Sequence, residues 1–236
     1  MTEVIPAIMP RNYEDLKNRI ALVRGLVQTV QIDICDGRFV RTATWPFTDS
    51  DLALDFHAQA ILNEEEGLPF WEEMDFEFDL MVADAVENFD FYTKFGPRRI
   101  IFHLEAQPDL EAFREFLEGI DLFLRENIQI GVAINPNTPI EKIFPMVNHI
   151  DFVQCMGIEK IGYQGEPFDE RVLNQIESLR KKYADVIISV DGAVDIDTGP
   201  KLVAAGANRL IAGSAIFKSA DMRETITYLE NIEIYK

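Results

Sequence analysis

The chain has 236 residues, of which 47% are hydrophobic, so its length and composition suit a folded protein with one large core and exclude a disordered chain. Its 41 acidic residues outnumber its 22 basic residues, and the resulting formal net charge of -19 excludes a surface built to bind nucleic acid or anionic lipid. No apolar run reaches the ~20 residues that a membrane span needs, and the N-terminus lacks the pattern of a signal peptide, so we expect a cytoplasmic protein that contacts no membrane.

Short β-branched runs alternate with amphipathic segments from one end of the chain to the other. The runs that we predict as strands are Val4–Ile8, Val30–Ile34, Phe76–Val82, Arg99–His103, Gln129–Ile134, Phe152–Cys155, Val186–Val190 and Arg209–Ala212. The segments that we predict as helices lie near Tyr13–Arg24, Ala85–Phe95, Leu110–Glu126, Ile140–Met146, Asp169–Tyr183, Thr198–Ala205 and Ala220–Ile232. Strands separated by helical segments of about 10–15 residues indicate βαβ units in a parallel sheet. Eight such units favour closure into a barrel of ~250 residues, so we predict an α/β protein with a single domain over residues 1–236, a (β/α)8 TIM barrel.

The segment between residues 42 and 74 interrupts this alternation because it is too long for a simple crossover. It carries Trp45-Pro46-Phe47, then a stretch over Ser50–Leu62 that we expect to contain a helix, then the acidic run Glu64–Glu66. Two interpretations are open: a lid or partner surface, and a solvated insertion without a role in binding. In the first, the aromatic residues Trp45 to Phe47 would be exposed and would contribute to an interface between copies of the chain.

Small residues follow each of the last three predicted strands. They are Gly162–Gly165, Gly192-Ala193 and Gly213-Ser214. Small residues let backbone amides approach an anion, and phosphate sites after strands seven and eight recur in this fold. A chain this acidic needs such local donors to hold a phosphate. We therefore predict a phosphate site at these strand ends, with glycines that serve only tight turns as the alternative.

Asp33 and Asp191 are the strongest acid–base candidates because each ends a predicted strand, the second and the seventh. In a closed barrel these strands face a ligand from different sides. Two carboxylates on opposite faces of a carbon next to a carbonyl can invert it, since one removes the proton and the other returns it from behind. The enediolate formed in between needs positive charge or hydrogen-bond donors. The alternative is that these aspartates cap helices or anchor loops.

The segment Gln31–Val40, which reads QIDICDGRFV, resembles the second-strand motif of the ribulose-phosphate 3-epimerase family. Similar segments follow in the family's order: DLMV at Asp79–Val82, FHLEA at Phe102–Ala106, GVAINPNTP at Gly131–Pro139, VDGAV at Val190–Val194 and AGANRLIAGSAIF at Ala205–Phe217. The resemblance extends from Val4 to about Asp221. It implies a ribulose-phosphate-binding TIM barrel that inverts C3 of a ketose phosphate such as ribulose 5-phosphate, in pentose phosphate metabolism.

The resemblance also implies roles for individual residues. The family's two acid–base aspartates fall on Asp33 and Asp191, and the family holds one divalent metal between these aspartates and two histidines. Gln31 and Asp79 stand at the positions of those histidines, so the implied metal ligands are Gln31, Asp33, Asp79 and Asp191. The residues implied to bind phosphate or substrate are Ala7, Met81, Met156, Gly162, Gln164, Gly165, Gly192, Ala193, Gly213 and Ser214.

The chain departs from the family pattern in its metal set. Imidazole suits zinc and iron, whereas carboxylate and amide oxygens suit magnesium or manganese, so the cofactor prediction is a divalent metal: Mg, Mn, Zn or Fe. Without a metal, three aspartates this close would repel one another, and one would stay protonated. His103 falls on a family histidine that is not a metal ligand. Ala7 replaces a hydroxyl residue, Ala193 replaces a glycine, and the Gly162–Gly165 loop is altered.

Two functions are therefore open: an epimerase of a ketose phosphate, and a sugar-phosphate-binding barrel that has lost turnover with its metal site. A lyase on a related barrel is a weaker candidate, because such barrels carry Asp-x-Lys-x-x-Asp at a strand end, and Asp33-Ile34-Cys35-Asp36 has no lysine. The expected partners are a small phosphorylated sugar and further copies of the chain, since family members commonly form dimers or hexamers.

Overall fold

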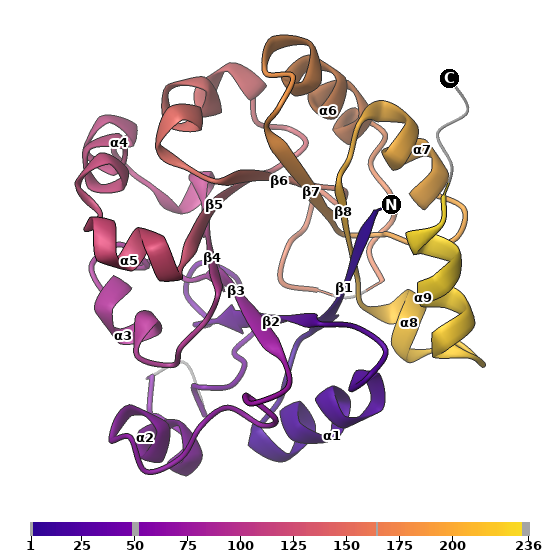
Figure 1. Ribbon diagram of the computed structural model, residues 1–236. Helices are drawn as coiled ribbons and strands as arrows, with labels where there is room; N and C mark the ends of the chain where they lie inside the picture. The colour runs from indigo at the N-terminus through magenta and orange to yellow at the C-terminus, as the bar shows by residue number, and fades with distance from the viewer. Residues whose placement is uncertain (1, 49–51, 164, 233–236) are drawn as a thin grey trace.

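The computed structural model describes residues 2–48, 52–163 and 165–232, and in it eight parallel strands close into a barrel in chain order (Figure 1). The strands are β1 (Glu3–Ile8), β2 (Thr29–Cys35), β3 (Asp75–Met81), β4 (Arg99–His103), β5 (Gln129–Ile134), β6 (Phe152–Met156), β7 (Ile187–Asp191) and β8 (Arg209–Ala212). Pairing of β1 with β8, from Glu3↔Arg209 to Pro6↔Ala212, closes the ring. The predicted (β/α)8 TIM barrel is confirmed.

The strands form because their sequences suit a sheet that is buried on both faces. Every residue of β2 is buried, and the sequence Thr29–Cys35 alternates apolar Val30, Ile32 and Ile34 with Gln31, Asp33 and Cys35. Side chains alternate between the two faces of a strand, so one face packs against the surrounding helices and the other points into the barrel. The register pairs Asp33 of β2 with Asp79 of β3, which places two inward carboxylates on neighbouring strands.

Helices surround the barrel (Figure 1). They are α1 (Tyr13–Val23), α2 (Phe56–Leu62), α3 (Phe89–Thr93), α4 (Leu110–Gly119), α5 (Leu122–Asn127), α6 (Arg171–Lys182), α7 (Gly199–Ala205), α8 (Ser214–Phe217) and α9 (Met222–Glu230), with 3-10 helices η1 (Leu104–Ala106) and η2 (Ile140–His149). No helix within the described ranges is both long and apolar enough to cross a membrane.

Three predicted helices differ from the structure. The segment near Ala85–Phe95 is helical only over α3 (Phe89–Thr93), and turns precede it. The continuous helix expected over Leu110–Glu126 is wrong, because Asp121 begins a new helix by accepting a hydrogen bond from Phe123 N. The segment from Ile140 is a 3-10 helix that contains Pro145, which has no N–H to donate.

The insertion between residues 42 and 74 contains the expected helix as α2, while residues 49–51 lie outside the described part of the chain. The expectation that Trp45 and Phe47 are exposed is wrong: their exposed fractions are 1% and 7%. Trp45 packs against Phe95 and donates its Nε1 hydrogen to Asp55. These aromatic side chains pack the insertion against the barrel. Because they are buried, they cannot form an interface with a second copy of the chain.

The N-terminal end of the barrel is filled by an ion-pair network. Arg99 Nη1 lies 3.0 Å from Glu77 Oε2, and Arg99 Nη2 lies 2.9 Å from Glu3 Oε1. Glu3 also contacts Arg209, whose Nε lies 2.9 Å from Glu3 Oε2. This network occupies the interior near the start of the strands and leaves the opposite end for a ligand.

Asp36 anchors the loop that follows β2. Its Oδ1 accepts hydrogen bonds from Arg38 N and Phe39 N at 2.8 and 2.9 Å, and its Oδ2 accepts one from Ala83 N at 2.8 Å. We expect Asp36→Ala to lower the free energy of unfolding by about 3 kcal/mol, because three backbone donors lose a charged acceptor. Asp36→Asn should cost less, since its remaining oxygen can still accept two of the three bonds. Urea unfolding measures both, and equal losses would contradict this account.

Candidate active site

A cavity of about 430 Å³ opens at the carboxyl ends of the strands. The predicted site residues that line it are Ala7, Asp33, Met81, Met156, Gly162, Gly165, Asp191, Gly192, Ala193, Gly213 and Ser214. Two predicted metal ligands, Gln31 and Asp79, do not reach the cavity and are fully buried. Gln164 lies outside the described residues. The structure therefore gathers most of the predicted site around one cavity and places two of its members beneath the cavity floor.

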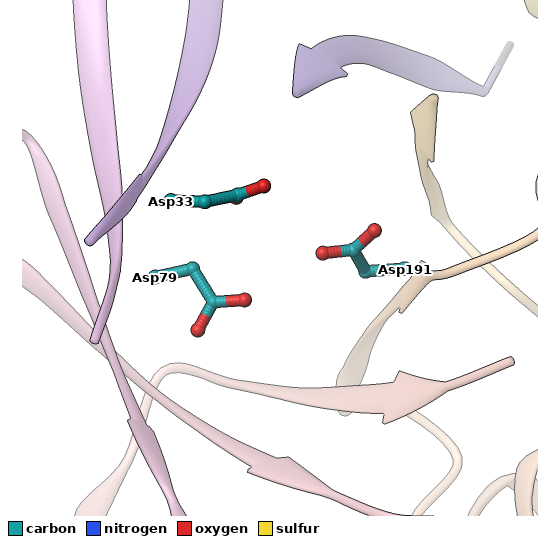
Figure 2. Close-up of side chains that lie close together, drawn as sticks. All are labelled: Asp33, Asp79 and Asp191. Carbon is teal, nitrogen blue, oxygen red and sulfur yellow. The ribbon is translucent and has the colours of Figure 1, made fainter. Parts of the chain in front are cut away.

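Three aspartates from different strands point toward one another (Figure 2). Asp33 comes from β2, Asp79 from β3 and Asp191 from β7, and one carboxylate oxygen from each lies within 4.8 Å of the others. Asp33 and Asp191 approach from opposite sides of the barrel and both reach the cavity (Figure 2). The pair thus faces a ligand from two directions, and Asp79 supplies a third carboxylate below them.

Gln31 links the two cavity-facing aspartates. Its Nε2 donates to Asp33 Oδ1 and to Asp191 Oδ2, each at 2.8 Å. Its Oε1 is buried without a hydrogen-bond partner among the described residues. Each aspartate therefore has one oxygen held by the same amide group, and the other oxygen has no side-chain donor within the described ranges.

The carboxyl groups of Asp33 and Asp191 hold their protons more tightly than an aspartate in water does. Burial is the main reason that the pKa of Asp33 lies well above its ordinary value, and the charges of Asp191 and Asp79 add to the effect. Burial and the charge of Asp79 raise the pKa of Asp191 to about 7. The amide of Gln31 acts in the opposite direction on both, because a donated hydrogen bond favours the ionised form. Near neutral pH one carboxyl can therefore carry a proton while the other is ionised.

The three carboxylates form a group that could hold a metal ion. The donor set is all oxygen, which fits a hard cation such as Mg²⁺ or Mn²⁺ better than zinc. A cation here would also relieve the repulsion that raises the pKa values of Asp33 and Asp191. Gln31 fits such an ion only if its amide turns over, so that the unpartnered Oε1, rather than Nε2, faces the aspartates.

The late-strand loops bring small residues and backbone to the cavity. Gly162 has a φ of +81°, and a Cβ there would lie 2.7 Å from Val40, so only glycine fits against the loop after β2. Thr42 Oγ1 donates to Gly162 O at 2.7 Å and fastens the two loops together. Ala193 has a φ of 52°, a conformation that favours glycine. None of the described residues lining the cavity is Lys or Arg, so an anion there would depend on backbone amides and hydroxyl groups.

The sequence did not single out several residues of the site. The part of the cavity wall that was not predicted includes Met9, Ile158, Ile161, Glu166 and Phe168, none of which carries a local signal of function. Gln154 was also missed: it is fully buried, and its Nε2 lies 3.2 Å from Asp79 Oδ2. A signal was present there, because an amide in the middle of the apolar strand Phe152–Met156 needs a partner inside the barrel. His103 lies against the same carboxylate, with Nε2 2.8 Å from Asp79 Oδ1.

The sequence is similar to that of a known protein family. The model of the ribulose-phosphate 3 epimerase family matches residues 3–217. Ribulose-phosphate 3-epimerase from Schizosaccharomyces pombe is 34% identical over 231 residues, which cover 97% of this chain and 92% of that protein. Ribulose-phosphate 3-epimerase from Bacillus subtilis is 29% identical over 242 residues, with 96% and 97% covered.

Solved structures with the same fold have little sequence in common with this chain. KGPDC from Streptococcus mutans has a TM-score of 0.68 at 12% identity, and the match covers 100% of each chain. The 3-hexulose-6-phosphate synthase from Salmonella typhimurium has a TM-score of 0.66 at 13% identity, with 98% of each chain covered. At these identities the likeness shows the fold alone.

Proposed function

Because the chain belongs to the ribulose-phosphate 3-epimerase family, we propose that it inverts a carbon next to the carbonyl of a ketose phosphate, with Asp33 and Asp191 as the two proton-transfer groups. One observation carries this proposal: two carboxylates reach the same cavity from strands on opposite sides of the barrel. Each has one oxygen free of side-chain donors among the described residues. Removal and return of a proton on opposite faces of a carbon requires two such groups.

Each aspartate takes a defined part in the proposed reaction. The ionised carboxylate removes the proton from the carbon next to the carbonyl, and the protonated carboxyl on the other side delivers its own proton to the opposite face. The raised pKa of Asp191, about 7, lets this group exist in either form near neutral pH.

The enediolate between the two steps carries negative charge and needs stabilisation. A divalent cation bound by Asp33, Asp79 and Asp191 would supply positive charge beside its oxygens. Gln31 would join this set through Oε1, and the all-oxygen donors favour magnesium or manganese over zinc or iron.

The phosphate of the substrate is proposed to bind at the late strands. Gly192, Gly213 and Ser214 line the cavity at the ends of β7 and β8, and Gly162 and Gly165 line it on the loop after β6. These residues bring backbone amides close without a side chain in the way, which suits an acidic protein. The substrate would then lie with its phosphate at these loops and its reacting carbon between Asp33 and Asp191.

A second candidate function is a sugar-phosphate-binding barrel without turnover. The observation in its favour is the Gln31 amide, which gives both acid–base aspartates a hydrogen bond from within the protein. Membership of an enzyme family favours the epimerase. Association into dimers or hexamers stays a prediction, and with Trp45 buried it has no assigned surface.

An isotope experiment separates these functions. The chain would be incubated in deuterated water with a panel of ketose phosphates, either with a chelator or with Mg²⁺, Mn²⁺, Zn²⁺ or Fe²⁺. We expect deuterium at the inverted carbon and formation of the epimer, most rapidly with Mg²⁺ or Mn²⁺. Tight binding of a ketose phosphate with no deuterium incorporation under any condition would select the binding protein instead.

A further inference from the structure

Asp79 differs from the other two aspartates because both of its oxygens are held. His103 on β4 places Nε2 2.8 Å from Oδ1, and Gln154 on β6 places Nε2 3.2 Å from Oδ2. All three side chains have an exposed fraction of 0%. They form a polar cluster beneath the cavity, assembled from β3, β4 and β6.

This pattern divides the aspartates into two kinds. Asp33 and Asp191 each accept from Gln31 through one oxygen, and neither has a second side-chain donor among the described residues. Asp79 accepts on both sides and does not line the cavity. A carboxylate with hydrogen-bond donors at both oxygens is fixed in orientation.

We propose that His103 and Gln154 are positioning residues that act through Asp79. By holding its carboxylate from two sides, they fix the orientation of Asp79 relative to Asp33 and Asp191, whose nearest carboxylate oxygens lie within 4.8 Å of one of its own. This inference rests on the proposed function, because it assigns a role within that same proton exchange.

The fixed orientation has a local structural basis. The ring of His103 packs against Phe39, with the two centroids 5.6 Å apart, which limits its rotation. Gln154 Nε2 also lies 3.8 Å from Met156 Sδ, and Met156 lines the cavity. Without these two donors the carboxylate of Asp79 would be free to rotate, and the arrangement of the three carboxylates would change.

The test is a pair of substitutions that remove each donor at similar volume. We expect Gln154→Leu and His103→Leu to lower kcat by about tenfold to a hundredfold, the effect of losing one hydrogen bond to a charged group, with KM changed by less than about threefold. His103→Gln can still offer an N–H to Asp79 and should retain most of the wild-type kcat. Gln175→Leu is the matched control: Gln175 is a buried glutamine that donates to Asn135 O and Thr138 O, away from the aspartates, and its loss should leave kcat unchanged.

The outcomes distinguish this inference from the proposed function. If Gln154→Leu and His103→Leu keep the wild-type kcat while Asp33→Asn abolishes turnover, the positioning role is wrong and the epimerase stands. If Asp33→Asn retains full turnover, the assignment of Asp33 as a proton-transfer group fails and the positioning role fails with it.

A second measurement does not depend on turnover. The chain has three histidines, so ¹⁵N NMR with His103→Gln as the assignment variant can identify the His103 ring. We expect a proton on Nε2, because the proposed positioning role requires this ring nitrogen to donate to Asp79 Oδ1. An unprotonated Nε2 would overturn the inference even if the chain proved inactive.

Discussion

Replacing either Asp33 or Asp191 by Asn is expected to lower kcat for epimerisation by roughly a thousandfold, the scale at which a positioned acid or base contributes to rate. Asn keeps the size of the side chain and one oxygen, but it can neither remove a proton from carbon nor deliver one. Both side chains reach the cavity, so each loss acts on the chemical step directly. Binding of a ketose phosphate should change by only a fewfold, because its proposed phosphate contacts lie on other loops.

The two variants should also differ from each other in a way that reveals their roles. With one of them replaced, the remaining carboxylate can still remove the proton from one epimer and exchange it with solvent without inversion. We therefore expect each variant to incorporate deuterium into a different epimer, measured by mass spectrometry or ¹H NMR. Asp75→Asn at the start of β3 is the matched control, since Asp75 pairs with Arg98 away from the cavity, and it should retain turnover. Equal exchange of both epimers by both variants would contradict the assignment.

A divalent cation is expected to stabilise the chain at pH 8 far more than at pH 5.5. The pKa of Asp191 is raised to about 7 and that of Asp33 lies well above its ordinary value, so both must lose protons before a cation can bind. At Mg²⁺ or Mn²⁺ concentrations a hundredfold above Kd, the free energy of unfolding should increase by about 2.7 kcal/mol, which for a chain of this size raises the thermal midpoint by roughly 5–10 °C. Thermal unfolding with cation and with chelator measures the difference.

Without the cation, the stability of the folded chain also depends on pH, and the direction of that dependence can be stated. A carboxyl whose pKa is higher in the folded than in the unfolded state binds its proton more tightly when folded. Its contribution to stability is present below the unfolded value of about 4 and is lost as the pH rises through about 7. The chelated protein should therefore lose stability over this window, and a cation should restore it. A cation effect of equal size at both pH values, or one that persists in the double variant Asp33→Asn with Asp191→Asn, would exclude this site.

The ligand set also predicts a change of metal preference. Gln31→His combined with Asp79→His would place two imidazoles beside Asp33 and Asp191. Since imidazole favours zinc, we expect the affinity for zinc to rise on the order of a hundredfold relative to magnesium. Competition with a chromophoric chelator measures zinc affinity directly, and an unchanged ratio would show that the ion does not bind among these residues.

The strands were predictable because each is a short apolar run buried on both faces, and their number indicated a closed barrel. The helices were less predictable than the strands. The break before Asp121 depends on a capping hydrogen bond that competes with a continuing amphipathic pattern. The burial of Trp45 depends on Tyr13 and Phe95, which lie far away in the sequence, and no local pattern contains that information.

The site was predictable where it follows from the ends of strands. Asp33, Asp191 and the late glycines were expected to lie together because ligand sites in this fold lie at the carboxyl ends of the strands, and they line one cavity. The position of Asp79 beneath the cavity was not predictable, because depth inside a barrel depends on strand tilt and stagger. Gln154 was not predicted, because the partner of its amide, Asp79, lies on a strand far away in the sequence.

The Gln31 amide makes equivalent hydrogen bonds to Asp33 and Asp191. One nitrogen offers one hydrogen to each, at the same distance of 2.8 Å. This contact therefore does not mark either carboxylate as the permanent acid or the permanent base. In the proposed reaction the two would exchange these roles when the reaction runs in the other direction. Such an epimerase would start from either epimer, and the relative concentrations of the two sugars would set the net direction of the reaction.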